Sequence, residues 1–170
     1  SDGTGNLFKE VWPLKSAGAA QSEVNLLDAL ATNRVAGARV DKMKDFGDAV
    51  ANAANSDLPM VVDDWMDMDE SISYIVVDRT IKNDDGAFHW YCGGTHCSNH
   101  NYFWYMDPSN NHAHLIPWDL DNAFANIITP HNDITPLADE WPETSNNCEP
   151  FPYGALNIRQ RSSPCDNLTG

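Results

Sequence analysis

The stretch 101-NYFWYMDPSNNHAHLIPWDLDN-122 decides how the rest of this chain can fold. Aromatic and apolar residues fill both of its arms, and the residues 107–111 between them, DPSNN, are typical of a tight turn. The stretch therefore predicts a β-hairpin. Asp119 and Asp121 follow its second arm, and the acidic segment 83–86, NDDG, precedes its first arm. Because a hairpin brings its two ends together, we expect these acidic groups to share one site.

Helices are predicted on the N-terminal side of this hairpin. Ser22 is a suitable N-cap for a helix over residues 23–33, and the apolar spacing predicts a second helix over 39–54. A third helix is predicted over 70–82, because apolar residues recur there at helical spacing. Gly86 lies just beyond its end and suits a left-handed backbone position.

The remaining segments predict short or irregular structure. Residues 6–12 favour a strand that Pro13 stops, and residues 55–59 favour a linker. The segment 92–100 predicts a loop, and the proline-rich tail over 125–170 predicts irregular chain that packs on the core. The expected fold class is α+β, helix-rich with a short β-hairpin, in a single domain over residues 1–170.

Charge and hydropathy restrict the partners of this domain. Ten basic residues against 25 acidic ones give a formal net charge of −15, which repels nucleic acids and anionic membranes. No apolar run approaches the roughly 20 residues that span a membrane. The chain begins without a Met or a signal peptide and leads at once into a strand-like run. We therefore expect a processed chain or a piece of a longer one, with a preceding strand missing.

The cysteines indicate an oxidising compartment. They form two locally spaced pairs, Cys92 with Cys97 and Cys148 with Cys165, without a C-x-x-C motif. This pattern favours disulfides and a secreted or cell-surface protein. The Cys148–Cys165 bridge would hold the tail and contribute about 3 kcal/mol in the chain-entropy model. Asn167 stands in an N-x-T glycosylation pattern.

The acidic groups around the hairpin predict a cation site. At about 4 Å and an effective dielectric constant near 20, each pair of carboxylates would repel by about 4 kcal/mol. Carboxylates together with Asn101 and Asn122 are hard oxygen ligands that suit Mg²⁺, Mn²⁺ or Ca²⁺. Solvated turn residues in a very acidic protein explain the spacing equally well. The order of parts, however, is that of a protein kinase catalytic lobe: a helix, an Asp-containing loop, an Asn, a hairpin and a later Asp.

Longer motifs identify a family. The segments GNLFKEVWP at 5–13, DRTIKNDDG at 78–86, HNYFWYMDP at 100–108 and IPWDLDNAF at 116–124 resemble the spore-coat CotH kinase family. The resemblance covers most of residues 5–170, including SPCDNLT at 163–169. It implies an atypical, kinase-like fold that is secreted or surface-associated and transfers the γ-phosphoryl group of ATP to protein.

The resemblance also implies roles for single residues. Asp85 would be the catalytic aspartate, and Asn101 would hold metal on the nucleotide. Asp119 would be the principal metal-ligating aspartate, with Asp121 as a further metal ligand. Lys9 would contact the ATP phosphates. The cofactors implied are ATP with Mg²⁺ or Mn²⁺, and Ca²⁺ is the alternative cation.

Two departures from the family pattern leave alternatives open. The family often has Trp before the catalytic aspartate, whereas this chain has Asp84, so the role falls on Asp84 or Asp85. The N-terminal lobe that covers the nucleotide is largely missing before Ser1. ATP binding would then require an associated N-terminal fragment. The alternative function is a non-catalytic extracellular structural or interaction domain, with an assembly partner or as a homo-oligomer.

Other metal sites were weighed as alternatives. Cys92, Cys97, His96 and His100 could ligate zinc, although the predicted loop and the cysteine spacing favour a disulfide. The turn 107–112 carries oxygen side chains but lacks the glycine of a calcium-binding EF-hand loop. The acidic residues over 63–70 predict a solvated helix entry, where carboxylates suit the helix dipole.

Overall fold

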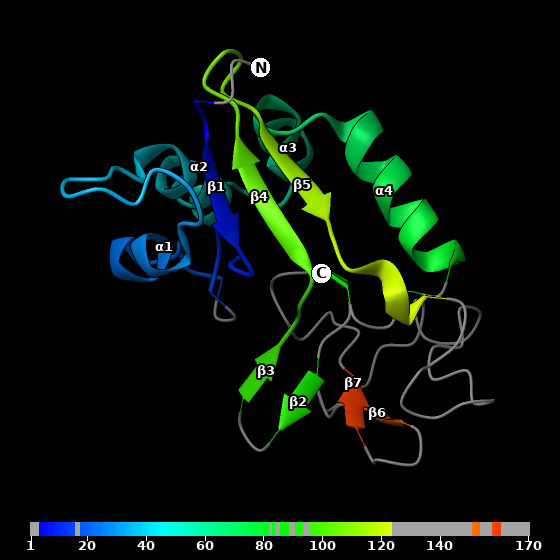
Figure 1. Ribbon diagram of the computed structural model, residues 1–170. Helices are drawn as coiled ribbons and strands as arrows, with labels where there is room; N and C mark the ends of the chain where they lie inside the picture. Colours follow the sequence, from blue (N-terminus) through cyan, green and yellow to red (C-terminus); the bar gives the residue numbers. More distant parts are fainter. Residues whose placement is uncertain are drawn as a thin grey trace. The chain divides into compact units, whose positions relative to one another are not determined.

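The computed structural model describes residues 4–15, 18–81, 83, 86–88, 91–93, 96–123, 151–153 and 158–160. These residues carry helices and antiparallel strands, so the expected α+β class is confirmed, while the kinase-like lobe stays a prediction (Figure 1). The chain's contacts group it into two compact units. The first unit spans residues 1–72 and 102–116, and the second spans residues 73–101 and 117–170.

A three-stranded sheet forms the centre of the first unit. Its strands are β1 (Asn6–Lys9), β4 (Tyr102–Met106) and β5 (Ala113–Pro117), with β4 between the other two (Figure 1). The predicted hairpin over 101–122 is therefore confirmed as β4 and β5. β1 pairs antiparallel with β4, so that Phe8 lies opposite Trp104. The strand ends at Lys9, three residues earlier than predicted, because Glu10 has a left-handed backbone with φ of 52°.

Alternate residues of β4 face the hydrophobic core. Tyr102, Trp104 and Met106 are buried, while Phe103 and Tyr105 between them are partly exposed. The Trp104 ring contacts Trp12 and Phe46 at centroid distances of 5.4 and 6.0 Å. Such edge contacts add to the stabilisation from area burial. The aromatic residues of the hairpin are thus mainly core residues, as the strand spacing predicts.

The helices begin near the predicted positions and end earlier. α1 (Glu23–Ala29) starts after Ser22, whose hydroxyl accepts the Asn25 N–H at 3.3 Å, which confirms the predicted N-cap. α2 (Asp41–Asn52) lies within the predicted range. α1 was predicted to reach residue 33, but Leu30 already pairs with Phe8 of β1. Pairing with the sheet edge therefore replaces the last helical turn.

Two further helices follow. α3 (Leu58–Trp65) begins within the linker predicted over residues 55–59. Pro59 fits its first turn, where a missing N–H costs nothing, and Trp65 stacks on Phe46 at 5.6 Å. α4 (Met68–Thr80) replaces the helix predicted over 70–82.

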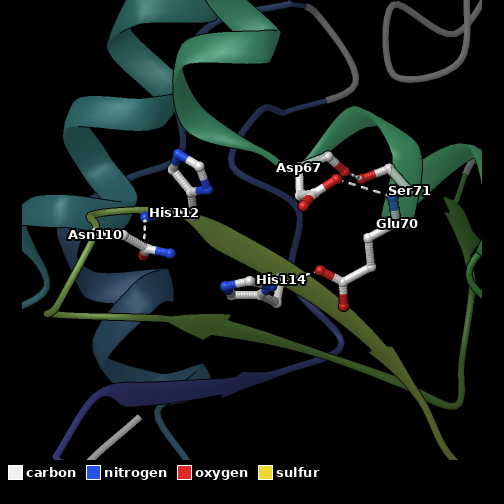
Figure 2. Close-up of polar contacts among 6 residues, drawn as sticks. All are labelled: Asp67, Glu70, Ser71, Asn110, His112 and His114. Carbon is white, nitrogen blue, oxygen red and sulfur yellow. Dashed lines mark hydrogen bonds and ion pairs between the residues drawn. The ribbon is translucent and has the colours of Figure 1, made fainter.

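The acidic helix entry predicted over 63–70 is confirmed for residues 67–70, whereas Asp63 and Asp64 lie in the last turn of α3. Asp67 precedes the helix, and its Oδ1 atom accepts the Glu70 N–H at 3.0 Å (Figure 2). Glu70 also lies 2.8 Å from His114 of β5, between Oε2 and Nδ1. Figure 2 shows these side chains meeting between the first turn of α4 and the strand. The carboxylates of this turn therefore interact favourably with the helix dipole. Glu70 also connects the helix to the sheet.

A four-stranded sheet belongs to the second unit. Its order is β3 (His96–Ser98), β2 (Tyr91–Gly93), β7 (Ile158–Gln160) and β6 (Phe151–Tyr153). The predicted loop over 92–100 is therefore wrong, and the irregular tail over 125–170 contains two strands. Both expectations failed because β2 pairs with β7, and sequence patterns do not detect such distant partners.

The turn between β4 and β5 is held by hydrogen bonds to Asp107. The Ser109 N–H and hydroxyl donate to Asp107 Oδ1 at 2.8 and 2.7 Å. These two bonds hold the pKa of Asp107 below its ordinary value of 3.8, and the backbone bond has the larger effect. The Asp107 carboxylate therefore organises the turn.

The first prediction concerns the core. Trp104→Ala removes the ring between Trp12 and Phe46 and should lower the free energy of unfolding by about 3–5 kcal/mol. Urea denaturation measures this change. Val35→Ala is the control, because Val35 is 69% exposed and its truncation should change stability by about 0.5 kcal/mol or less. Equal effects of the two substitutions would contradict the proposed core.

The second prediction concerns acid stability. Ser109→Ala removes one donor and should raise the pKa of Asp107 toward 3.8, as measured by NMR titration of its carboxyl carbon. A carboxylate with a lowered folded pKa stabilises the fold above its unfolded pKa, and this stabilisation is lost as the pH falls through the folded pKa. The stability of the Ser109→Ala variant should therefore depend less on pH below about 4. Ser73→Ala, at an exposed position on α4, is the control and should leave the pKa of Asp107 unchanged. An unchanged pKa of Asp107 in Ser109→Ala would refute this assignment.

Candidate functional site

The segment that carries the expected catalytic aspartate is bounded by buried residues. Asp84 and Asp85 lie outside the described residues, whereas Asn83 before them is fully buried and Gly86 after them is buried. The choice between the two aspartates thus stays a prediction.

Gly86 is required for space and not for a left-handed backbone. Its φ lies outside the left-handed region, so the sequence-based expectation is wrong on this point. A Cβ atom at this position would overlap Asn83 Nδ2 and lie 2.8 Å from Asp78 Oδ1. Glycine is therefore present because the segment approaches the last turn of α4 closely.

A backbone hydrogen bond brings together the segments that carry the expected metal ligands Asn101 and Asp119. Asn101 is 8% exposed, and its carbonyl accepts the Trp118 N–H at 3.1 Å. Asp119 follows Trp118 directly and is exposed. Asn101 and Asp119 both have left-handed backbones, with φ of 59° and 52°. Such conformations are uncommon outside glycine and often mark functional positions.

Asp119 and Asp121 do not lie on one extended strand. Asp119 caps the 3₁₀ helix η1 (Leu120–Asn122), which contains Asp121. Asp119 precedes this helix with a left-handed backbone, and the side chains of Asp119 and Asp121 are both exposed.

Lys9 lies at the end of β1 in the first unit. It is opposite Phe103, on the face of the sheet that turns away from Phe8 and Trp104. Its ammonium group is 3.8 Å from Glu10 Oε1, and 46% of its side chain is exposed. Its contact with ATP phosphates stays a prediction.

Sequence reasoning missed a set of buried polar side chains in the second unit. Asp78, Asn83 and Asn99 are at most 4% exposed. Asp78 stands in the last turn of α4, where the helix dipole disfavours an anion. That unfavourable position within the motif DRTIKNDDG was the available signal.

Among the described residues, no three His, Cys, Asp or Glu side chains form a group that could hold a metal ion. The turn 107–112 belongs to these described residues, and Asp107 accepts both Ser109 donors there. None of the described helices is long and apolar enough to cross a membrane.

The strands β2 and β3 place Cys92 directly opposite Cys97. Opposed residues of an antiparallel pair have Cα atoms about 4.5–5.5 Å apart, which is within the range of a disulfide. His96 belongs to β3. His96 and His100 therefore do not share one helix face, which is the arrangement that a zinc site at this spacing would favour. Cys148 and Cys165 lie outside the described residues, as does Asn167.

Comparison with protein families agrees with these motifs. The family model described as CotH kinase protein matches residues 8–154. The chain therefore belongs to the CotH kinase protein family. No curated protein matches it.

The third prediction concerns the cysteine pair. We expect Cys92 and Cys97 to resist alkylation in the native protein unless a reductant is added. Mass spectrometry of the alkylated peptides measures this protection, and Cys92→Ser should expose the partner thiol as the control. Labelling of both cysteines without reductant would contradict a disulfide.

Proposed function

We propose that this chain transfers the γ-phosphoryl group of ATP to hydroxyl groups of a protein substrate, with Mg²⁺ or Mn²⁺. Asp85 is assigned to the acceptor hydroxyl, Asn101 and Asp119 to the metal, and Lys9 to the nucleotide. Asp121 is a further candidate ligand. A secreted or cell-surface location belongs to the same proposal and is supported by the opposed cysteines of β2 and β3.

One observation supports the proposal most directly. The Trp118 N–H binds the carbonyl of Asn101, so the two segments with oxygen donors, 99–101 and 118–121, meet in the second unit. In kinases, an asparagine and a later aspartate hold the metal on the nucleotide phosphates. Membership of the CotH kinase family supports the same roles.

The donor set fits magnesium better than calcium. Mg²⁺ is usually bound by one or two protein oxygen donors together with substrate phosphates, whereas Ca²⁺ takes six to eight oxygen ligands. Asn101 and Asp119 supply an amide and a carboxylate, and no three-residue acidic group is found in the described part of the chain. When bound, the metal would neutralise charge on the phosphates.

Chain residues account for the rest of the proposed chemistry. The carboxylate of Asp85 would orient the acceptor hydroxyl and accept its proton as the oxygen attacks the γ-phosphorus. The bond from the γ-phosphorus to the β,γ-bridging oxygen breaks, and ADP leaves with the bonding electron pair. The ammonium group of Lys9 would offset charge on the phosphates.

The fourth prediction tests this function. The full chain is incubated with γ-labelled ATP, Mg²⁺ or Mn²⁺, and dephosphorylated casein as a generic hydroxyl acceptor. Asp85→Asn and Asp119→Asn should each lower labelling roughly 100-fold or more. Asp63→Asn, an exposed carboxylate on α3, should leave labelling unchanged.

Metal binding distinguishes the two candidate functions. Binding of Mn²⁺ in the presence of ATP is measured by electron paramagnetic resonance for the same variants. Loss of binding in Asp119→Asn together with loss of labelling supports the kinase. Wild-type protein that binds neither nucleotide nor Mn²⁺ and labels no acceptor would refute it and favour a non-catalytic domain. The Lys9 side chain is 46% exposed and its ammonium group pairs with neighbouring Glu10. This exposure is the observation in favour of the non-catalytic alternative.

A further inference from the structure

The last turn of α4 is joined to the segment after it by two hydrogen bonds between the same two residues. The Asn83 N–H donates to the Asp78 carbonyl at 3.1 Å, and Asn83 Nδ2 donates to Asp78 Oδ1 at 2.7 Å. The backbone bond has the spacing of a Schellman C-cap, in which the sixth residue returns to the first. The side-chain bond lies in the interior, where Asp78 is 1% exposed and Asn83 is fully buried.

The same pair lies directly beneath Gly86. A Cβ atom on Gly86 would meet both the Asn83 amide and the Asp78 carboxylate, so the backbone of residue 86 rests on these two side chains. Asn83 and Gly86 enclose the positions of Asp84 and Asp85 in the sequence. Both ends of this short segment are therefore held against Asp78.

A second buried amide continues the connection toward Asn101. Asn99 is 4% exposed, and its Nδ2 atom donates to the carbonyl of Ala87, the residue after Gly86. Asn101 follows two residues later, and its carbonyl accepts the Trp118 N–H. Buried polar groups thus connect the end of α4, the segment 83–87 and the segment that leads to Asp119.

The position of Asp78 is unfavourable for stability alone. Burial of a carboxylate is costly unless hydrogen bonds compensate for lost hydration, and well-packed apolar residues often replace buried charges without loss. The C-terminal end of a helix adds an unfavourable dipole interaction for an anion. A carboxylate in this place therefore indicates a requirement for its directional acceptor, which an apolar residue cannot supply.

We propose that Asp78 is a positioning residue for the phosphoryl-transfer site. Through Asn83 and Gly86 it sets the position of the segment that bears Asp85, and Asn99 aligns that segment with Asn101. The inference rests on the proposed function for its catalytic consequence. Its structural part is that the Asp78–Asn83 side-chain bond holds residues 83, 86 and 87 at the end of α4, and this part can be tested without activity.

The fifth prediction uses an exchange of the two side chains. Asp78→Ala should lower the turnover number roughly 10- to 100-fold, with a much smaller change in the KM for ATP. Asn83→Asp places two carboxylates together and should cause a similar loss. The double variant D78N/N83D restores one amide donor and one carboxylate acceptor, so it should recover most of the lost turnover. The assay is labelling of casein from γ-labelled ATP.

Hydrogen exchange of the backbone amides supplies a readout that does not depend on catalysis. Peptides that cover residues 82–88 should exchange faster in Asp78→Ala and return toward the wild-type rate in D78N/N83D. Thr80→Ala is the matched control, because Thr80 is exposed in the same helical turn and its hydroxyl binds the Val76 carbonyl. It should change neither exchange of this segment nor turnover.

The outcomes separate the two proposals. Unchanged exchange over 82–88 in Asp78→Ala would overturn the positioning role, whatever the activity. Faster exchange that the double variant does not reverse would also overturn it, because the side-chain bond would then not be the cause. If the wild-type chain transfers no phosphoryl group, the proposed function fails, while the exchange rates still decide the structural role. Faster exchange with rescue, accompanied by loss and recovery of turnover, supports both.

Discussion

Packing of the Trp104 ring between Trp12 and Phe46 is the constraint on which the first unit depends. Trp104 lies in the middle of β4, the central strand, so its burial determines which face of the sheet turns to α2. Lys9 and His114 consequently lie on the other face. Because β4 begins directly after Asn101, the core also defines where the segment with the expected metal ligand ends.

Among the described residues of the second unit, hydrogen bonds join polar side chains in the interior. Asp78, Asn83 and Asn99 are polar and yet almost completely buried. An interior held by directional bonds specifies distances and angles more strictly than an apolar one, and an error in it is more costly.

Local patterns predicted local elements well. The alternation of residues 102–106 and the turn residues 107–111 identified the hairpin, and Ser22 identified the start of a helix. These signals depend on neighbours within about four residues. The predictions failed where a distant partner decided the outcome. Leu30 leaves its helix to pair with Phe8, and the segment 91–93 becomes a strand because Gln160 and Arg159 lie beside it.

The sequence by itself determined the family, the residue types of the candidate site and the hairpin that separates its two halves, because motifs and periodicity are properties of the chain. Only the tertiary structure decided how these residues are held. The left-handed backbone of Asp119, the 3₁₀ helix that contains Asp121 and the close approach at Gly86 depend on segments that meet through folding. Asp78 is the clearest case. Its carboxylate becomes a buried acceptor only when Asn83 folds back over the end of the helix, a contact that no periodicity encodes.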